Sequence, residues 1–264
     1  MPISNEPALK SVEIFNQLIL LPFDATEEIG RIEWQLRQLR RSSCSDGNSS
    51  VALLQALIMQ GKAGEAHALA IEIWDKRYLL SDDAIEGFTY MLASLGEFEK
   101  SLEIGPDEYD DWSGKLFAPT LLEIGVGLGD LDILSVAIDM LAIDSEFQVE
   151  LKSLLSSWTE IGLVKYFHEQ QSVIRQVMDG KFTEYTTLIQ KTEGGGIELC
   201  VLYHVRENRL ERRSLEELID ESIVNFYAGT DIDDPFYFNA HLNYIVADVT
   251  SKWPPKIINA PDPT

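Results

Sequence analysis

Histidines and carboxylates are the residues of this sequence that could bind a metal ion or transfer protons. The four histidines are His67, His168, His204 and His241, and no two have the spacing with which one helix presents two imidazoles to a metal. His204 and His241 fall on the more polar side of two segments in which apolar residues alternate. Two interpretations stay open: a shared metal or acid–base site, or separate surface histidines of a sheet.

Three aspartates before Pro235 offer oxygen ligands to a hard cation. Asp231, Asp233 and Asp234 could hold Mg²⁺ together with a phosphate substrate, and His241 follows them closely. The same residue types commonly form a turn before a proline. A metal-dependent enzyme using these residues is therefore one alternative function. The sequence has no glycine-rich phosphate loop, nucleophile elbow or cysteine–histidine pair, so we expect no enzyme activity, no cofactor and no metal.

The densest acidic cluster in the chain contains two aromatic residues. It comprises Asp107, Glu108, Tyr109, Asp110, Asp111 and Trp112. The ligand spacing and central glycine of an EF-hand calcium loop are absent. Exposed tyrosine and tryptophan side chains often anchor protein interfaces, so we predict that this segment contacts another protein.

Negative charge is concentrated in the middle of the chain. The formal net charge of the 264 residues is −23, and residues 51–150 hold 5 Lys and Arg against 20 Asp and Glu. Such a field repels nucleic-acid phosphates and anionic lipid, and it speeds the encounter with a basic protein. Acidity can also serve solubility alone. The expected partner is a protein with a basic surface or segment, with neither nucleic acid nor membrane involved.

Cysteine usage and hydropathy indicate a reducing compartment. Cys44 and Cys200 are too few for a disulfide framework. The first residues lack the basic flank and long apolar run of a signal peptide, and the apolar segment Leu18 to Phe23 is too short to span a bilayer. We expect a cytoplasmic protein.

The elements that would position these residues are organised by three glycines. Gly61, Gly96 and Gly129 are 35 and 33 residues apart, and each separates two apolar patterns with helical spacing. A fixed period in the thirties is typical of stacked helical hairpins, because one hairpin cannot bury its apolar side without its neighbours.

This pattern resembles the tetratricopeptide repeat, a 34-residue helix-turn-helix with a glycine near the end of its first helix. Small residues early in the second helix, Ala66 and Ser101, fit the resemblance, whereas the helix-A tryptophan and a constant closing proline are missing. The resemblance implies a superhelical stack whose first helices line a groove. The groove positions that it implies are Gln55, Met59, Asp83, Glu86, Tyr90 and Glu123. Their acidic and aromatic character suits a peptide that carries Lys or Arg.

The predicted fold is mainly α, a helical-hairpin array followed by a small α/β C-terminal module. We divide the chain into an atypical N-terminal hairpin (1–50), tetratricopeptide-like repeats (51–191), a strand-helix-strand module (192–250) and a disordered tail (251–264). Residues 182–190 are expected to form the last array helix. In the module, we expect strands at 197–205 and 238–246, and a helix that begins at a capping box of Ser214 and Glu217.

The predicted function is a non-enzymatic adaptor that binds a basic protein segment through its acidic helical surface. A second hypothesis is an immunity or inhibitor protein that neutralises a toxin or a nucleic-acid-binding enzyme by acidic mimicry. The third is the metal-dependent enzyme above. The oligomeric state stays open.

Overall fold

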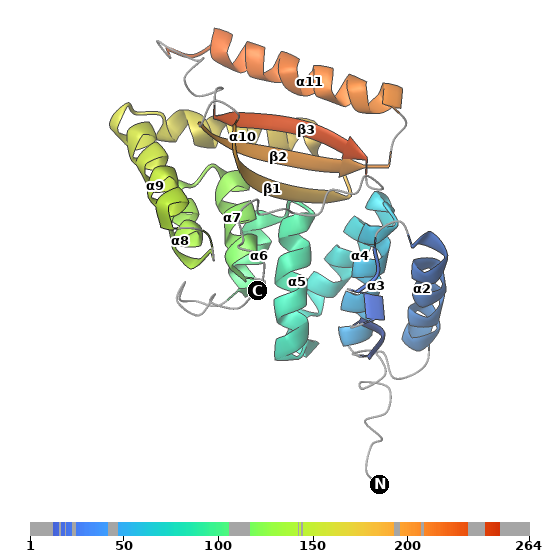
Figure 1. Ribbon diagram of the computed structural model, residues 1–264. Coiled ribbons are helices and arrows are strands. Elements are labelled where there is room, and N and C mark those ends of the chain that lie inside the picture. Colours follow the sequence, from blue (N-terminus) through green and yellow to red (C-terminus); the bar gives the residue numbers. More distant parts are fainter. Residues whose placement is uncertain are drawn as a thin grey trace.

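The computed structural model shows a helical array with a three-stranded sheet on one end of it (Figure 1). It describes residues 13–15, 17–18, 20–22, 25–41, 47–105, 117–141, 143, 145–192, 196–206, 209–231 and 241–248. Residues 251–264, expected to be a tail, and residues 107–112 lie outside the described residues.

The array helices follow a short helical stretch at residues 13–18, of which residue 16 is not described. They are α2 (Thr26–Arg41), α3 (Gly47–Met59), α4 (Ala63–Asp75), the short 3-10 helix η1 (Arg77–Leu79), α5 (Asp82–Ser94), α6 (Phe98–Ile104), α7 (Phe117–Leu128), α8 (Leu131–Met140), α9 (Ser145–Glu160) and α10 (Val164–Met178). The C-terminal module consists of β1 (Glu184–Lys191), β2 (Ile197–Val205), α11 (Arg209–Ala228) and β3 (Leu242–Asp248). The predicted fold class is confirmed.

Four glycine turns join the hairpins α3–α4, α5–α6, α7–α8 and α9–α10. Gly61, Gly96, Gly129 and Gly162 all have positive φ, between 65° and 80°. At each turn, the glycine N–H donates to the carbonyl three residues earlier, and the next N–H donates to the carbonyl five residues earlier. This is the Schellman helix end, in which glycine adopts the left-handed conformation at little cost. Gly162 follows Gly129 by 33 residues, so it continues the period by one hairpin that the sequence analysis did not single out.

Glycine also permits close contact between the two helices of the α7–α8 hairpin. A Cβ atom on Gly125 would lie 2.8 Å from the backbone nitrogen of Leu134. One on Gly129 would lie 2.6 Å from the Cα atom of His168 in α10. Successive hairpins are therefore held together at backbone distance here.

The buried side chains form two clusters that follow the chain. One cluster joins the N-terminal helices through α5, and the other joins α6 through α10 to the sheet and α11. The division falls inside the second hairpin, where Leu92 and Leu95 belong to the first cluster and Ala93 and Phe98 to the second. Phe98 reaches the sheet, since its ring centroid lies 4.9 Å from that of Tyr185. The second half of the array and the sheet therefore share one core.

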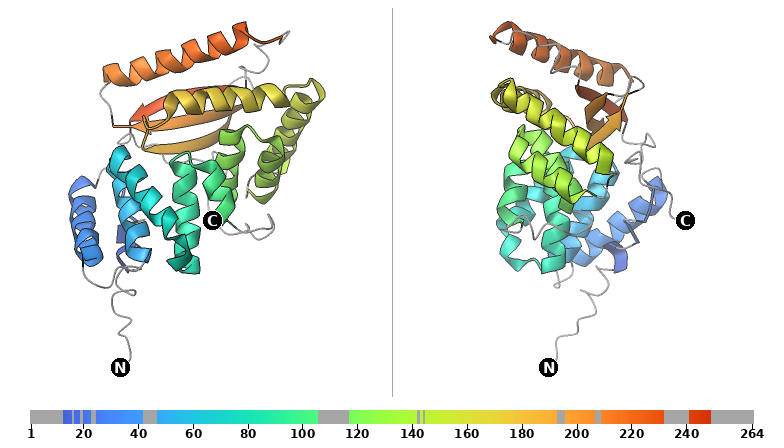
Figure 2. Two further views of the ribbon diagram at one scale, coloured as in Figure 1. Left: turned by 180° about the vertical axis from the view of Figure 1, so that it is seen from behind. Right: turned by 60° about the vertical axis from the view of Figure 1, so that its left-hand side comes forward.

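The sheet has the order β1-β2-β3, with β1 antiparallel to β2 and β2 parallel to β3. One of its faces packs against α10, whose Gln170 and Gln171 donate hydrogen bonds to the Tyr244 hydroxyl at 3.0 and 2.7 Å. Helix α11 connects β2 to β3 and lies beyond α10 and the sheet (Figure 2). Ile219 is its one buried residue, so most of this helix is solvent-exposed.

Three local predictions in the C-terminal module are corrected. Residues 184–191 are strand β1 and not a helix, because their β-branched and aromatic residues pair with β2 along the whole strand. Helix α11 begins at Arg209, so Ser214 is inside it and donates to the Leu210 carbonyl at 3.1 Å. The last strand is β3, at Leu242–Asp248, and residues 232–240 lie outside the described residues.

Candidate functional site

The predicted groove positions lie on the first helices of successive hairpins. Gln55, Tyr90 and Glu123 each precede their turn glycine by six residues, so they are equivalent positions on α3, α5 and α7. Gln55 and Tyr90 are half-buried, whereas Glu123 is only 6% exposed.

The other predicted positions also differ in exposure. Met59 is buried and Glu86 is half-buried. The side chain of Asp83 and the whole cluster Asp107, Glu108, Tyr109, Asp110, Asp111 and Trp112 lie outside the described residues. The described groove positions therefore do not form one open acidic surface.

Strand β1 explains the burial, because it contacts both α5 and α7 (Figure 1). Glu184, the first residue of β1, lies near Tyr90 and Glu123 and interacts electrostatically with both. The sheet of this chain thus covers the place where the sequence analysis expected a partner.

The covered site holds two carboxyl groups without a nearby counter-charge among the described residues. Glu123 Oε2 is buried and accepts no hydrogen bond from a described residue. Burial, and then the charge of Glu184, raises the pKa of Glu123 well above its ordinary value. Burial raises the pKa of Glu184 to about 7. Burial and the charges of Glu184 and Glu123 also raise the pKa of Tyr90. This site retains protons near neutral pH.

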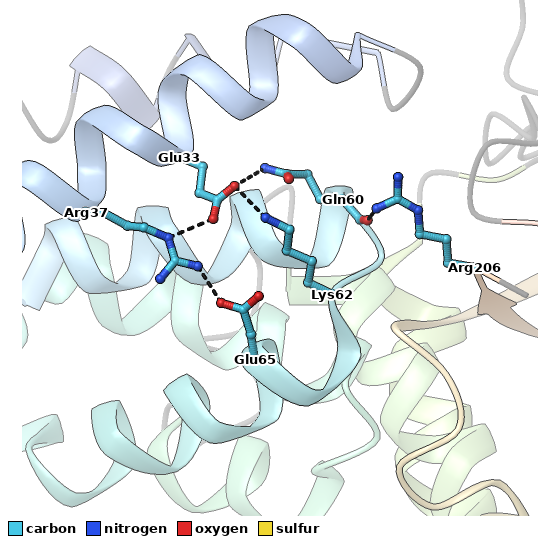
Figure 3. Close-up of polar contacts among 6 residues, drawn as sticks. All are labelled: Glu33, Arg37, Gln60, Lys62, Glu65 and Arg206. Atoms are coloured by element: carbon cyan, nitrogen blue, oxygen red, sulfur yellow. Dashed lines mark hydrogen bonds and ion pairs between the residues drawn. The ribbon is translucent and has the colours of Figure 1, made fainter.

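A second polar cluster surrounds Glu33 of α2 and ties α2 to the first hairpin (Figure 3). The Glu33 carboxylate accepts hydrogen bonds from Arg37 Nε at 2.7 Å, and from Gln60 Nε2 and Lys62 Nζ at 2.8 Å. Arg37 continues the network to Glu65 of α4 at 2.5 Å. Burial alone would raise the pKa of Glu33, but the hydrogen bonds from Lys62, Arg37 and Gln60 outweigh it, so the pKa lies below its ordinary value.

The sequence analysis missed this cluster, although Glu33 occupies a position on the apolar stripe of its helix. Ile29, Ile32 and Leu36 are the other members of that stripe, and Glu33 is the one charged residue among the buried residues of α2. A carboxylate on an apolar stripe, with a Lys and an Arg within reach of neighbouring helices, is the signal that could have found it.

Arg206 extends the network to the sheet. Its guanidinium donates to the Gln60 carbonyl (Figure 3), and a Cβ atom on Gly61 would lie 2.9 Å from the Arg206 side chain. Arg206, Arg212 and Arg213 are close together in the sequence. The structure separates them, since Arg212 pairs with Asp248 and Arg213 with Glu217. Arg206, Arg212 and Arg213 therefore serve internal contacts.

A pocket of about 640 Å³ lies where α2 ends and α3 begins. Its lining includes Arg37, Arg40, Arg41 and Lys76. Arg40 forms two hydrogen bonds of 2.8 Å with Glu72, and Lys76 pairs with the same carboxylate. Most of its positive charge is thus compensated within the chain.

The histidines do not form the shared site that one interpretation required. His204 pairs with Ala247 near the end of β3, whereas His241 precedes β3 and its Nδ1 atom lies 2.7 Å from the Ile197 carbonyl oxygen. The two rings therefore lie at opposite ends of the strands. Burial lowers the pKa of His204 to about 4, so this ring is neutral.

Metal ligation finds no support within the part of the chain that the structure describes. No group of three or more His, Cys, Asp and Glu residues there is arranged to hold a metal ion. Asp233 and Asp234 are outside the described residues. Asp231 is described and is exposed.

Every described Lys and Arg in the hairpin helices α3 to α10, η1 and their turns forms an ion pair with a carboxylate. They are Lys62, Lys76, Arg77, Lys100, Lys152, Lys165 and Arg175. The exposed acids Asp75 and Asp82 form no ion pair with a described residue. The charges left for other molecules in this part of the array are therefore negative.

The fold and these contacts define a helical-hairpin array protein with an α/β module docked on it. No family model matches the chain, and no curated protein or solved structure is significantly similar to it. Among the described residues, no helix has both the length and the apolar character needed to cross a membrane.

Proposed function

We propose that this protein is a non-enzymatic adaptor of the tetratricopeptide-like type that binds a basic segment of another protein through the acidic end of its hairpin array. The observation that carries the proposal is that every described Lys and Arg of α3 to α10, η1 and their turns is paired with a carboxylate of the chain. A cationic partner would find carboxylates that have no competing counter-ion in the array.

The acidic end is the end of the array that faces away from the sheet, and its described carboxylates without an ion pair to a described residue include Asp75, Asp82 and Glu86. Gly61 contacts Arg206 and Gly96 contacts Phe182, so the C-terminal ends of α3 and α5 face the sheet. The start of α5 and the end of α4 are consequently at the opposite end (Figure 1). Asp75 and Asp82 are exposed there, and Glu86 is half-buried.

The segment with the predicted contact residues Tyr109 and Trp112 connects α6 to α7, and both of its attachment points belong to this end. Contact by its acidic and aromatic residues stays a prediction from the sequence. The cytoplasmic location belongs to the same proposal, and it is supported by the free thiol of Cys200, which is buried in the sheet.

Affinity purification at low salt, followed by mass spectrometry, tests the proposal. The wild type is compared with the double reversal Asp82→Lys and Glu86→Lys, and we expect at least a tenfold loss of the co-purifying basic protein, since each lost ion pair and each new repulsion weakens the encounter. The matched control reverses Asp132 and Glu160, an exposed pair at the turn end of the array.

Circular dichroism of both variants must show intact helices, because charge reversal at the first turn of α5 also acts on the helix dipole. Equal recovery of partners by wild type and the Asp82/Glu86 variant would overturn the proposal. A complex of one-to-one stoichiometry with a single toxin or nuclease would favour the inhibitor hypothesis instead.

A further inference from the structure

A pocket distinct from the acidic end lies where α4 and the second glycine turn meet α10 and the sheet. Its volume is about 310 Å³, which is at the lower limit of small-molecule sites. Its lining comes from widely separated segments and includes His67, Phe98, Arg175, Phe182, Tyr185 and Tyr203.

Three polar atoms of these lining residues are buried and form no hydrogen bond with any described residue. They are the Tyr203 hydroxyl, Arg175 Nε and His67 Nε2. Tyr203 is 1% exposed. Buried polar groups without a partner are rare in folded proteins, because each has lost its hydration without compensation. Three of them around one pocket are donors whose acceptors a bound ligand could supply.

The neighbouring contacts show which protons these groups offer. Arg175 Nη1 donates to Glu99 at 2.8 Å, which leaves the Nε–H of the same guanidinium for another acceptor. Burial raises the pKa of the Tyr203 hydroxyl, and the nearby Arg175 charge only partly opposes this, so the phenol keeps its proton. The imidazole of His67 can donate from Nε2 when that nitrogen carries the proton.

Aromatic rings surround these donors. The centroids of Phe182 and Tyr203 lie 5.0 Å apart, and those of Tyr185 and Tyr203 lie 5.5 Å apart, both in edge-to-face geometry. The Arg175 guanidinium carbon is 5.9 Å from the Phe98 ring centroid. Such walls suit a flat, apolar body whose one polar group faces the donors.

We propose that this pocket binds a small aromatic monocarboxylate, with the carboxylate accepting hydrogen bonds from Arg175 Nε and the Tyr203 hydroxyl and the ring lying among Phe98, Phe182 and Tyr185. A carboxylate fits better than a phosphate dianion, because Glu99 already shares the guanidinium charge and the acids Glu97 and Asp179 line the same pocket. The three donor atoms favour an anionic acceptor group over a cation.

Benzoate is the probe, and benzamide, which has the same shape without the charge, is its matched control. Isothermal titration calorimetry of the full chain is expected to show binding of benzoate at least tenfold tighter than that of benzamide. Benzoate should also raise the thermal midpoint of unfolding, because a ligand that binds only the folded state stabilises it.

Two substitutions locate the binding. Tyr203→Phe removes a hydroxyl that has no hydrogen-bond partner among the described residues, so it should leave the stability of the ligand-free protein unchanged or slightly higher, yet weaken benzoate at least tenfold. Arg175→Gln should weaken benzoate at least as much. The controls are Tyr78→Phe and Arg213→Gln, whose side chains are exposed and lie outside the pocket.

Absence of benzoate binding at millimolar concentration would overturn the proposal, as would binding that Tyr203→Phe and Arg175→Gln leave unchanged. Arg175→Gln also removes the partner of Glu99 and can affect folding, whereas the Tyr203→Phe result is independent of that contact. Capture of a basic protein at the acidic end is a separate measurement, so either proposal can fail without the other.

Discussion

The Glu33 carboxylate of α2 and the Lys62 ammonium group of the first glycine turn lie 2.8 Å apart, although they are separated by 29 positions in the sequence. Glu33 is 7% exposed, so water contributes little to its solvation and the protein donors replace it. This contact joins the atypical first hairpin to the repeating part of the array.

Glu33→Gln should lower the free energy of unfolding by about 2 kcal/mol, because it leaves Lys62 and Arg37 without the charge that they share. Glu28→Gln, an exposed change on the same helix, is the control and should have a much smaller effect. Urea unfolding followed by circular dichroism measures both. Equal midpoints for the two variants would contradict the role assigned to Glu33.

Acid should weaken the wild type more than the Glu33→Gln variant. The pKa of Glu33 is lower in the folded chain than its ordinary value. The resulting stabilisation is therefore present above the unfolded pKa and is lost as the pH falls through the folded pKa. Thermal unfolding from pH 7 down to pH 3 should show the two midpoints converging, and curves that stay parallel would refute this linkage.

Glu184 should show the opposite pH dependence. Its pKa in the folded chain is about 7, above the unfolded value, so it contributes stability in its protonated form that is fully present below the unfolded pKa and lost as the pH rises toward and through 7. Glu184→Gln should therefore raise the free energy of unfolding at pH 8 by roughly 1 to 2 kcal/mol and change it little at pH 4. The expected change is reduced because Glu184 is partly exposed to solvent.

The exposed change Glu160→Gln is the control for Glu184→Gln. Urea unfolding at pH 4 and pH 8 gives the four free energies needed. A Glu184→Gln variant that is destabilised at pH 8 would show that the carboxylate has a favourable partner, contrary to the environment described here.

Gly162→Ala should destabilise the protein by about 1 kcal/mol, because the turn holds residue 162 at a φ of 76° and an added Cβ favours negative φ. No atom lies within 4 Å of that Cβ, so the effect is conformational and not steric. Gly30→Ala, in the middle of α2 and equally free of contacts, should instead stabilise by roughly 0.5 to 1 kcal/mol. Opposite signs in thermal unfolding are the expected result, and a neutral Gly162→Ala would contradict the requirement for glycine.

The array was predictable because its signals are local. A glycine between two apolar stripes specifies a helix end and a new helix within a few residues, and the period could have been followed from Gly129 to Gly162. Strand β1 was not predictable in this way, because Tyr185 and Thr187 are buried only through pairing with β2 and contact with Phe98. The structure of these residues therefore depends on contacts that the local sequence does not specify.

The candidate sites show the same difference between local signals, which the sequence reveals, and contacts between distant segments, which it does not. Glu123 was correctly placed on the first helix of its hairpin, yet its burial depends on Glu184 and β1, more than fifty positions later in the chain. Arg175, His67 and Tyr203 come from three separate segments, and their spacing in the sequence matches no binding motif. Their missing hydrogen bonds could be identified only from the assembled structure.

The docking of β1 on α5 and α7 also orders events during synthesis on the ribosome. The helices that carry Tyr90 and Glu123 are translated well before the strands that cover them, so both side chains meet water in the growing chain and lose it only when the sheet arrives. Association of such distant segments is slow compared with the formation of a helical hairpin. We therefore expect the sheet to close over the array late in folding, and this step removes water from the carboxyl groups of Glu123 and Glu184.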